Sequence, residues 1–179
     1  IWRFDIFNGK DSAGGTEGNR LVEGGMVASL GNVEQSAPRT ESNTIRFFNA
    51  PDPALITQPG PTFINIAIGS GHRELPATDK TVVNWMFSVR DYNVLSPLLS
   101  SWYKADCSGS TTVCHEIVQE GDLVDLTSIV GASATAAVPA GSSGAAGWKI
   151  QLEETGEKVL AEARTFQNNV FFTTYAPVT

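Results

Sequence analysis

Short stretches in which apolar and aromatic residues gather, or alternate with polar residues, run along most of the chain. Stretches of this length and composition are typical of β-strands. Clusters of glycine, proline and asparagine separate them, which places turns and loops in between. The strands predicted in this way cover residues 1–7, 21–30, 45–48, 63–68, 82–89, 148–152, 158–163 and 168–175.

Proline and glycine mark where several of these strands should end. Pro51 and Pro53 follow the strand 45–48 and predict that it stops before Asp52, which we interpret as an Asx-type turn former. The segments 148–152 and 158–163 are separated by a Glu-Glu-Thr-Gly turn, so we expect them to pair as a hairpin.

Two stretches have a different pattern. Residues 95–104 are compatible with a short helix, and residues 120–129 carry apolar side chains that would share one helical face. Residues 8–19 are rich in glycine and are predicted to be a loop. Residues 131–147 are rich in Ala, Ser and Gly and are predicted to be a flexible connection.

The composition favours an all-β fold. The chain has 179 residues, of which 41% are hydrophobic and 17% charged, enough for one core. Its 17 glycines and nine prolines suit many strands and turns better than a helical bundle. Short strands at regular spacing, with long loops, predict a fragment of a β-propeller with loop insertions; a β-sandwich is the alternative.

The net charge, the apolar runs and the two ends of the sequence limit the kinds of function that we expect. The net charge is −7 and basic residues do not cluster, which argues against nucleic-acid binding. No apolar run approaches the ~20 residues that span a membrane, so we expect no direct membrane insertion. The chain has no signal peptide and opens and closes within predicted strands. We therefore interpret residues 1–179 as a single partial domain, an internal fragment of a larger protein.

Two cysteines indicate the compartment. Cys107 and Cys114 frame a short segment rich in Ser and Thr, which suits a short hairpin closed by a disulfide. Two free thiols, or a metal site that includes His115, are the alternatives. A disulfide would indicate an oxidising location, in the periplasm or outside the cell. We expect residues 95–120 to be an insertion stapled by this bond.

Several segments, taken in their order along the chain, resemble one protein family. They are Trp2–Asp5, Phe47–Asp52, Ile66–Glu74, Val89–Asn93, Asp122–Thr127, Gly147–Leu152, Gly156–Val159 and Val170–Pro177. In this order they resemble the C-terminal propeller of the type IV pilus tip-adhesin family, the PilY/PilC-like proteins. The resemblance covers most of the chain.

The resemblance implies a protein outside the cell, at the pilus tip and outer-membrane surface. Its implied role is to support pilus assembly, surface attachment and twitching motility by binding. The implied partners are minor pilins or other tip subunits and a host or abiotic surface. Some family members bind calcium through an aspartate-rich loop. Asp5, Asp11 and Glu17 lack the alternating spacing of such a loop, so we predict no cofactor in this chain, with calcium open for the parent protein.

The glycine-containing segment at residues 69–73 could bind an anion or could simply form a turn. Gly69, Gly71, His72 and Arg73 could cradle an anion, but we favour a turn in which His72 and Arg73 bond to neighbouring carbonyls or to Asp91.

Catalysis is disfavoured because Asp52, His72 and Asp91 have no serine in a nucleophile-elbow pattern beside them. We predict no enzyme. A quinoprotein-type dehydrogenase propeller and a purely structural envelope propeller are the alternatives. Of the four tryptophans, Trp2, Trp85 and Trp148 are expected in blade cores, and Trp102 with Tyr103 forms the candidate surface contact.

Overall fold

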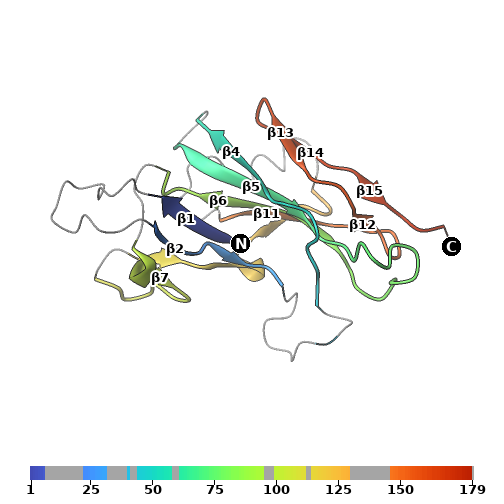
Figure 1. Cartoon of the computed structure of the whole chain (residues 1–179), viewed down its shortest axis with the longest axis horizontal. Helices are drawn as coiled ribbons and strands as arrows, with labels where there is room; N and C mark the ends of the chain where they lie inside the picture. Colours follow the sequence, from blue (N-terminus) through green and yellow to red (C-terminus); the bar gives the residue numbers. More distant parts are fainter. Residues whose placement is uncertain are drawn as a thin grey trace.

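The chain folds as an all-β protein. The computed structural model describes residues 1–6, 22–31, 40, 44–57, 61–94, 99–111, 114–129 and 146–178. Within these ranges the regular elements are β-strands and two one-turn 3-10 helices, η1 (Ser100–Trp102) and η2 (Glu120–Asp122) (Figure 1). No helix in the described part is long and apolar enough to cross a membrane. The all-β prediction is confirmed, and the radial arrangement of a propeller stays a prediction.

A five-stranded sheet forms the centre of the fold. Its strand order is β10 (Val124–Asp125), β11 (Gly147–Gln151), β6 (Trp85–Asp91), β5 (Phe63–Gly69) and β4 (Asp52–Ile56). All neighbours are antiparallel except β10 and β11, which are parallel. The two strands expected at 63–68 and 82–89 are therefore adjacent and lie at the middle of the sheet.

β5 and β6 are the central strands, and both of their faces are buried. Along β6, Trp85, Phe87 and Val89 point to one side and Met86 to the other, and all four are buried. A strand that is buried on both faces needs a layer on each side of it.

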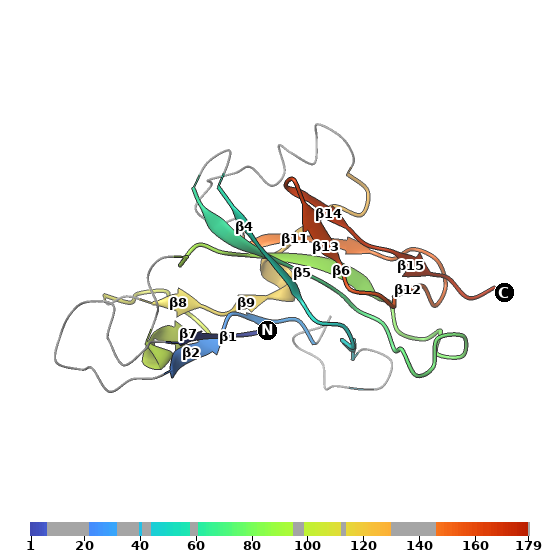
Figure 2. The same cartoon turned by 45° about the horizontal axis from the view of Figure 1, so that its top comes forward.

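Shorter strand pairs supply those two layers, which lie on opposite sides of the central sheet in Figure 2. One side holds three pairs: β1 (Trp2–Ile6) with β2 (Val22–Met26), β3 (Ala28–Ser29) with β9 (Val118–Gln119), and β7 (Tyr103–Lys104) with β8 (His115–Glu116). The other side holds two pairs: β12 (Lys158–Val159) with β15 (Thr174–Tyr175), and β13 (Arg164–Phe166) with β14 (Asn169–Phe171).

Two hydrophobic cores result, one on each face of the central sheet. The larger core joins Ile66, Ile68, Trp85, Phe87 and Val89 of the sheet to Val27, Ala28, Leu30, Ile45, Val82, Val118 and Leu123. The smaller core joins Ala67 and Met86 to Leu152, Val159 and Ala163. The order is therefore layer, core, sheet, core, layer.

The predicted role of Asp52 is wrong. The strand expected at 45–48 is absent, and Asp52 instead begins β4, which pairs with β5 from Asp52↔Ala67 onward. Pro53 is tolerated because β4 is the edge strand of the sheet, where a missing N–H breaks no ladder bond. The Asp52 carboxylate accepts a hydrogen bond from the Thr165 backbone N–H at 2.5 Å and so fixes β13 beside β4.

Three further predictions about local structure are wrong. Residues 120–129 form η2 and β10 instead of a helix, because the backbone of Val124–Asp125 pairs with β11. The hairpin of 148–152 with 158–163 does not form, because β11 pairs with β6 and β12 pairs with β15. The strand expected at 168–175 is divided into β14 and β15.

Other predictions fall partly or wholly outside the described residues. Of the expected helix at 95–104, the structure describes 99–104, which form η1 and β7. The loop predicted at 8–19, which includes Asp11 and Glu17, lies outside the described ranges. Of the flexible connection predicted at 131–147, residues 131–145 also lie outside them, while Gly147 begins β11. The N-terminus lies near the middle of the molecule and the C-terminus at one end (Figure 1).

Candidate functional site

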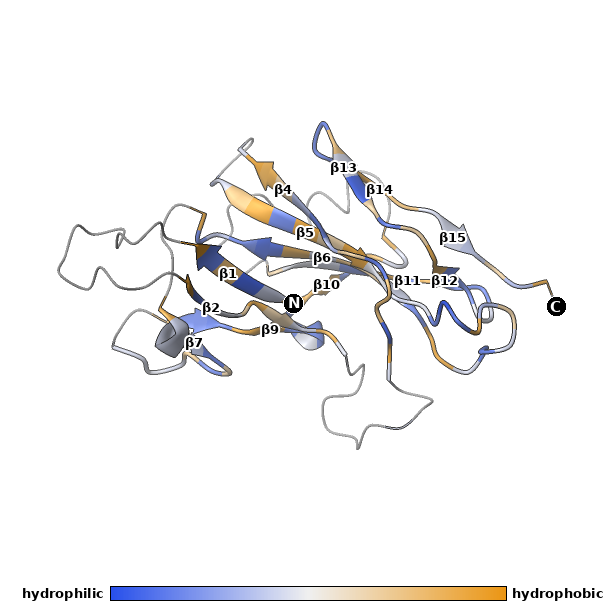
Figure 3. Cartoon of the chain, viewed as in Figure 1, coloured by the Kyte–Doolittle hydropathy of each residue, from blue (hydrophilic) through white to orange (hydrophobic). Residues whose placement is uncertain are grey.

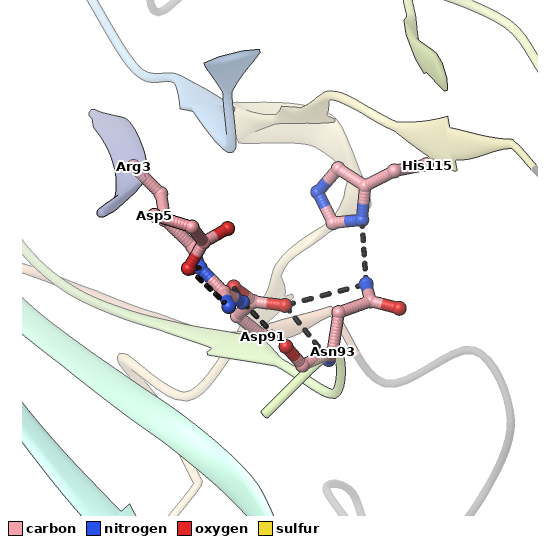
Figure 4. A network of polar contacts seen from close by, with 5 residues as sticks. All are labelled: Arg3, Asp5, Asp91, Asn93 and His115. Atoms are coloured by element: carbon pink, nitrogen blue, oxygen red, sulfur yellow. Dashed lines mark hydrogen bonds and ion pairs between the residues drawn. The ribbon is translucent and has the colours of Figure 1, made fainter. Parts of the chain in front are cut away.

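A polar network connects β1 to the end of β6. The Arg3 guanidinium donates to Asp91 Oδ2 at 2.8 Å, to the Asn93 carbonyl at 2.5 Å and to Asp5 Oδ1 at 2.7 Å (Figure 4). Asp91 is 1% exposed and also accepts the Asn93 backbone N–H at 2.9 Å. A buried carboxylate needs this many donors to balance the loss of its hydration.

His115 of β8 completes the network. Its Nδ1 lies 2.9 Å from the Asn93 side-chain amide nitrogen, and its ring meets the Tyr103 ring edge-on at 4.9 Å between centroids. Burial lowers the pKa of His115, the Asp91 carboxylate raises it in part, and the Arg3 guanidinium lowers it further. The neutral imidazole therefore predominates near pH 7, with Nδ1 accepting the Asn93 N–H.

A disulfide between Cys107 and Cys114 holds the segment that leads into β8. The prediction of this bond is confirmed, but the segment is not a hairpin. β7 and β8, on either side of it, pair in parallel, Tyr103 with His115 and Lys104 with Glu116, so the chain must cross back before β8 begins. Asp106 accepts the backbone N–H and the hydroxyl of Ser108, and these bonds lower the pKa of its carboxyl.

The two candidate contact residues differ in their surroundings. Tyr103 lies in β7 and packs against the larger core, close to Gly25, where an added Cβ would lie 2.3 Å from its ring. Trp102 is half-buried in η1, which is fixed to β2 because Ser100 donates to the Glu23 carboxylate from both its N–H and its hydroxyl. Tyr103 is thus a packing residue in this structure, and Trp102 stays a candidate contact.

A cleft of about 330 Å³ opens beside this network. Its lining combines charged, amide and aromatic side chains with a few apolar ones: Arg90, Tyr92, Asn93, His115, Glu116, Val118, Asp122 and Ala146. Arg90 is positioned by stacking its guanidinium over the Phe63 ring at 4.9 Å. Side chains of this kind can hydrogen-bond a small polar ligand or the polar edge of a partner protein.

The glycines of the 69–71 turn serve packing. A Cβ on Gly69 would lie 2.4 Å from the Val159 side chain, and one on Gly71 would lie 2.7 Å from Lys158 Cβ. The turn is therefore where β12 closes onto the central sheet, with the Val159 N–H bonded to the Ser70 carbonyl at 3.0 Å. No anion is needed to explain these glycines.

His72 was predicted to bond to a neighbouring carbonyl or to Asp91, but the partner of its side chain is Asp79. Its Nδ1 lies 3.1 Å from Asp79 Oδ2, whereas Asp91 bonds to Arg3. Burial raises the pKa of Asp79, but bonds from His72 and Thr81 outweigh it and hold that pKa below its usual value. Arg73 is exposed.

The side chains considered for catalysis are not assembled. Asp52 binds Thr165, His72 binds Asp79, and Asp91 binds Arg3, each in a separate contact. Within the described ranges, no three His, Cys, Asp or Glu side chains lie close enough to hold a metal ion.

Sequence reasoning missed the residues that carry the buried polar contacts. Arg3, Asn93 and His115 are far apart in the chain, and only the placement of β1 and β8 beside β6 brings them together (Figure 4). It also missed Lys158, a fully buried amine that donates to the carbonyls of Gly156 and Asp79. Burial lowers the pKa of Lys158, and the nearby Asp79 partly offsets that effect.

Comparison with known proteins gives one informative result. No protein-family model matches the chain, and no curated protein matches it significantly. Among solved structures, the chain is similar to the C-terminal domain of PilY1 from Pseudomonas aeruginosa, with a TM-score of 0.53 and 14% sequence identity. The similarity covers 98% of this chain and 39% of the solved chain.

This similarity concerns the fold. Nearly the whole chain follows the backbone path of part of the PilY1 C-terminal domain, although few residues are identical. The chain therefore has a PilY1-like fold, and it spans less than half the length of the solved structure.

Proposed function

We propose that this chain is part of a type IV pilus-associated surface protein that acts by binding and not by catalysis. The observation that carries the proposal is the PilY1-like fold, which extends over 98% of the chain. The segments that resemble the pilus tip-adhesin family, in the same order along the chain, support the same role. The disulfide supports an extracellular location, since such bonds persist in oxidising compartments.

The binding surface that we propose combines the disulfide-stapled segment with the cleft beside it. Residues 104–106 and 108–111 are exposed, while their ends are fixed by the Cys107–Cys114 bond and by the pairing of β7 with β8. An exposed segment on a rigid sheet can vary without disturbing the core, which is why binding residues are common in such places. Trp102 lies at its base and Asn93, Glu116 and Asp122 line the cleft.

The first test removes the protein. Cells without it should lose twitching motility and pilus-dependent attachment, and the intact gene should restore both. If a deletion strain attaches and moves like the parent strain, the pilus-related role is wrong.

The second test locates the surface. Trp102→Ala should weaken attachment while pili still assemble, because a buried aromatic contact is typically worth about 2 kcal/mol, or roughly thirtyfold in affinity. Ser101→Ala, at an exposed neighbour in η1, is the matched control and should have no effect. Equal attachment by the two variants would exclude Trp102 from the contact and leave the first test unaffected.

A further inference from the structure

The strand β6 ends in polar residues at the wall of the cleft of about 330 Å³. Figure 3 shows the change along this strand, from hydrophobic positions to a hydrophilic end. Asp91 is buried, whereas Arg90 and Tyr92, on either side of it in the sequence, line the cleft. The end of β6 therefore brings a guanidinium and an aromatic ring to the cleft.

Phe63 of β5 holds both of these side chains in place. The Arg90 guanidinium lies over the Phe63 ring, 4.9 Å from its centroid. The Tyr92 ring packs on the same ring, with centroids 5.4 Å apart, and Tyr92 is still 36% exposed. A set of N–H donors and a partly exposed aromatic ring are thus positioned before any ligand arrives, which lowers the entropy cost of binding one.

Asn93 supplies a hydrogen-bond acceptor with a fixed direction. Its side-chain nitrogen lies 3.4 Å from Asp91 Oδ1 and 2.9 Å from His115 Nδ1. An ionised carboxylate only accepts hydrogen bonds, so the NH₂ group and not the oxygen of Asn93 must face Asp91. Asn93 Oδ1 is thereby turned away from both partners (Figure 4), and Asn93 lines the cleft.

β8 and η2 add two carboxylates to the lining. Glu116 is exposed in β8, and Asp122 lies in η2, where its Oδ2 accepts the Gln119 backbone N–H at 2.7 Å. The described lining residues therefore include one cation, Arg90, and two anions. Burial lowers the pKa of His115, so its imidazole adds no charge near pH 7.

This mixture of charges fits a neutral ligand better than a charged one. An anion would be attracted by Arg90 but repelled by Glu116 and Asp122, and a cation would meet the reverse. A hydroxyl group both donates and accepts hydrogen bonds. A ligand with several hydroxyls can therefore bond to the guanidinium, to the amide oxygen and to a carboxylate at the same time.

We propose that the cleft binds a sugar ring of a carbohydrate. Its hydroxyls bond to Arg90, Asn93 Oδ1 and Glu116, and the apolar C–H face of the ring packs on Tyr92. The cleft volume lies near the lower end of the roughly 300–1,000 Å³ of small-molecule sites, which suits one or two sugar rings. This proposal rests on the binding role proposed above and names the chemical class of the ligand.

A glycan array probed with the purified 179-residue chain tests the proposal. The array carries neutral and charged glycans of animal cells and of bacterial polysaccharides, so the glycans that bind also identify the source of the ligand. The chain should bind neutral glycans that share one terminal sugar. Binding to no glycan, or to charged glycans only, would overturn the proposal.

Nuclear magnetic resonance locates the site. The methyl glycoside of the shared sugar, added to the ¹⁵N-labelled chain, should shift the side-chain amide signals of Asn93 and the backbone amide signal of Glu116. Shifts confined to residues outside the cleft would show that the sugar binds elsewhere, which contradicts the proposal.

Variants of Glu116 separate hydrogen bonding from charge. Glu116→Ala should weaken binding of the methyl glycoside about tenfold or more, because it removes an ionised acceptor. Glu116→Gln keeps an acceptor and should stay within about threefold of the parent chain. Glu153→Ala, at an exposed acid between β11 and β12, is the matched control and should not change the affinity.

Two results with these variants would contradict the proposal. Equal losses for Glu116→Ala and Glu116→Gln would show that the site recognises charge and not hydroxyls. Unchanged affinity in both would exclude Glu116 from the site. Circular dichroism and an intact Cys107–Cys114 bond establish that each variant is folded before its affinity is compared.

The carbohydrate site and the pilus-related role can fail separately, because the array needs only the purified chain. If the chain binds glycans while a deletion strain attaches and moves normally, the pilus-related role is wrong and the carbohydrate site stands. If the deletion strain loses attachment but the chain binds no glycan, the carbohydrate site is wrong.

Discussion

Removal of the Asp91 carboxylate should loosen the contact between β1 and the central sheet. Asp91→Ala removes one bond from Arg3 and two from Asn93, at 2.8, 2.9 and 3.4 Å. Truncation of one member of a buried ion pair typically costs 3–5 kcal/mol. Arg3 retains Asp5 and the Asn93 carbonyl, so we expect the low end of that range, about 3 kcal/mol.

Urea unfolding monitored by circular dichroism measures this change directly. For a chain of this size about 3 kcal/mol corresponds to a fall of roughly 6–12 °C in unfolding temperature. The slope of the free energy of unfolding against urea should stay constant, since the same surface is exposed on unfolding.

A double-mutant cycle separates the interaction energy between Arg3 and Asp91 from the energies of their other contacts. Arg3→Met keeps the apolar stem of the side chain and removes the charge, and the double variant should be less destabilised than the sum of the single variants. Arg164→Met, at a side chain that is 69% exposed, is the control and should stay within about 0.5 kcal/mol. Additivity of Arg3→Met and Asp91→Ala within about 0.5 kcal/mol would refute a direct coupling.

Three other predictions follow from the same structure. Gly69→Ala should destabilise the protein by roughly 1–3 kcal/mol through overpacking, and Val159→Ala in the same chain should restore part of that loss in thermal unfolding. Burial lowers the pKa of His115 in the folded state, so the unfolded state binds this proton more tightly. The free energy of unfolding should therefore keep its full value above about pH 6.5 and decrease below it. In unfolding measured against pH, a His115→Gln variant should show a smaller decrease. Replacing Cys107 and Cys114 together with Ser should cost about 2–3 kcal/mol, and a non-reduced digest should contain the linked peptide in the native protein only.

Strands could be predicted from the sequence where the local pattern of apolar residues is sufficient to favour a strand. β5 and β6 are rich in apolar and aromatic residues, and such stretches favour a strand that is covered on both faces whatever its neighbours are. The Cys107–Cys114 bond was predictable for a similar reason, since a spacing of seven residues keeps the two thiols close in any compact loop. Gly69 has no room for a side chain because Val159 packs against it, and not because its backbone conformation is unusual.

The pairing of the shorter strands was not predictable in this way. Residues 148–152 and 158–163 have the pattern of a hairpin, yet β11 pairs with β6, and its Trp148 packs against the smaller core. The Asp52-Pro53 pattern indicates a turn, yet an edge position in the sheet accommodates the proline.

An all-β chain with a central pair of strands and a disulfide-closed segment could be predicted from the sequence, because these features depend on residues that are close together along the chain. Which strands are neighbours, and therefore where the candidate site lies, depends on contacts between distant segments. Arg3, Asp91 and His115 come from three distant segments, and their bonds exist because two layers pack on opposite faces of one sheet. The outward position of Trp2, Phe4 and Ile6 was hidden for the same reason, since an alternating strand does not reveal which of its two faces turns inward.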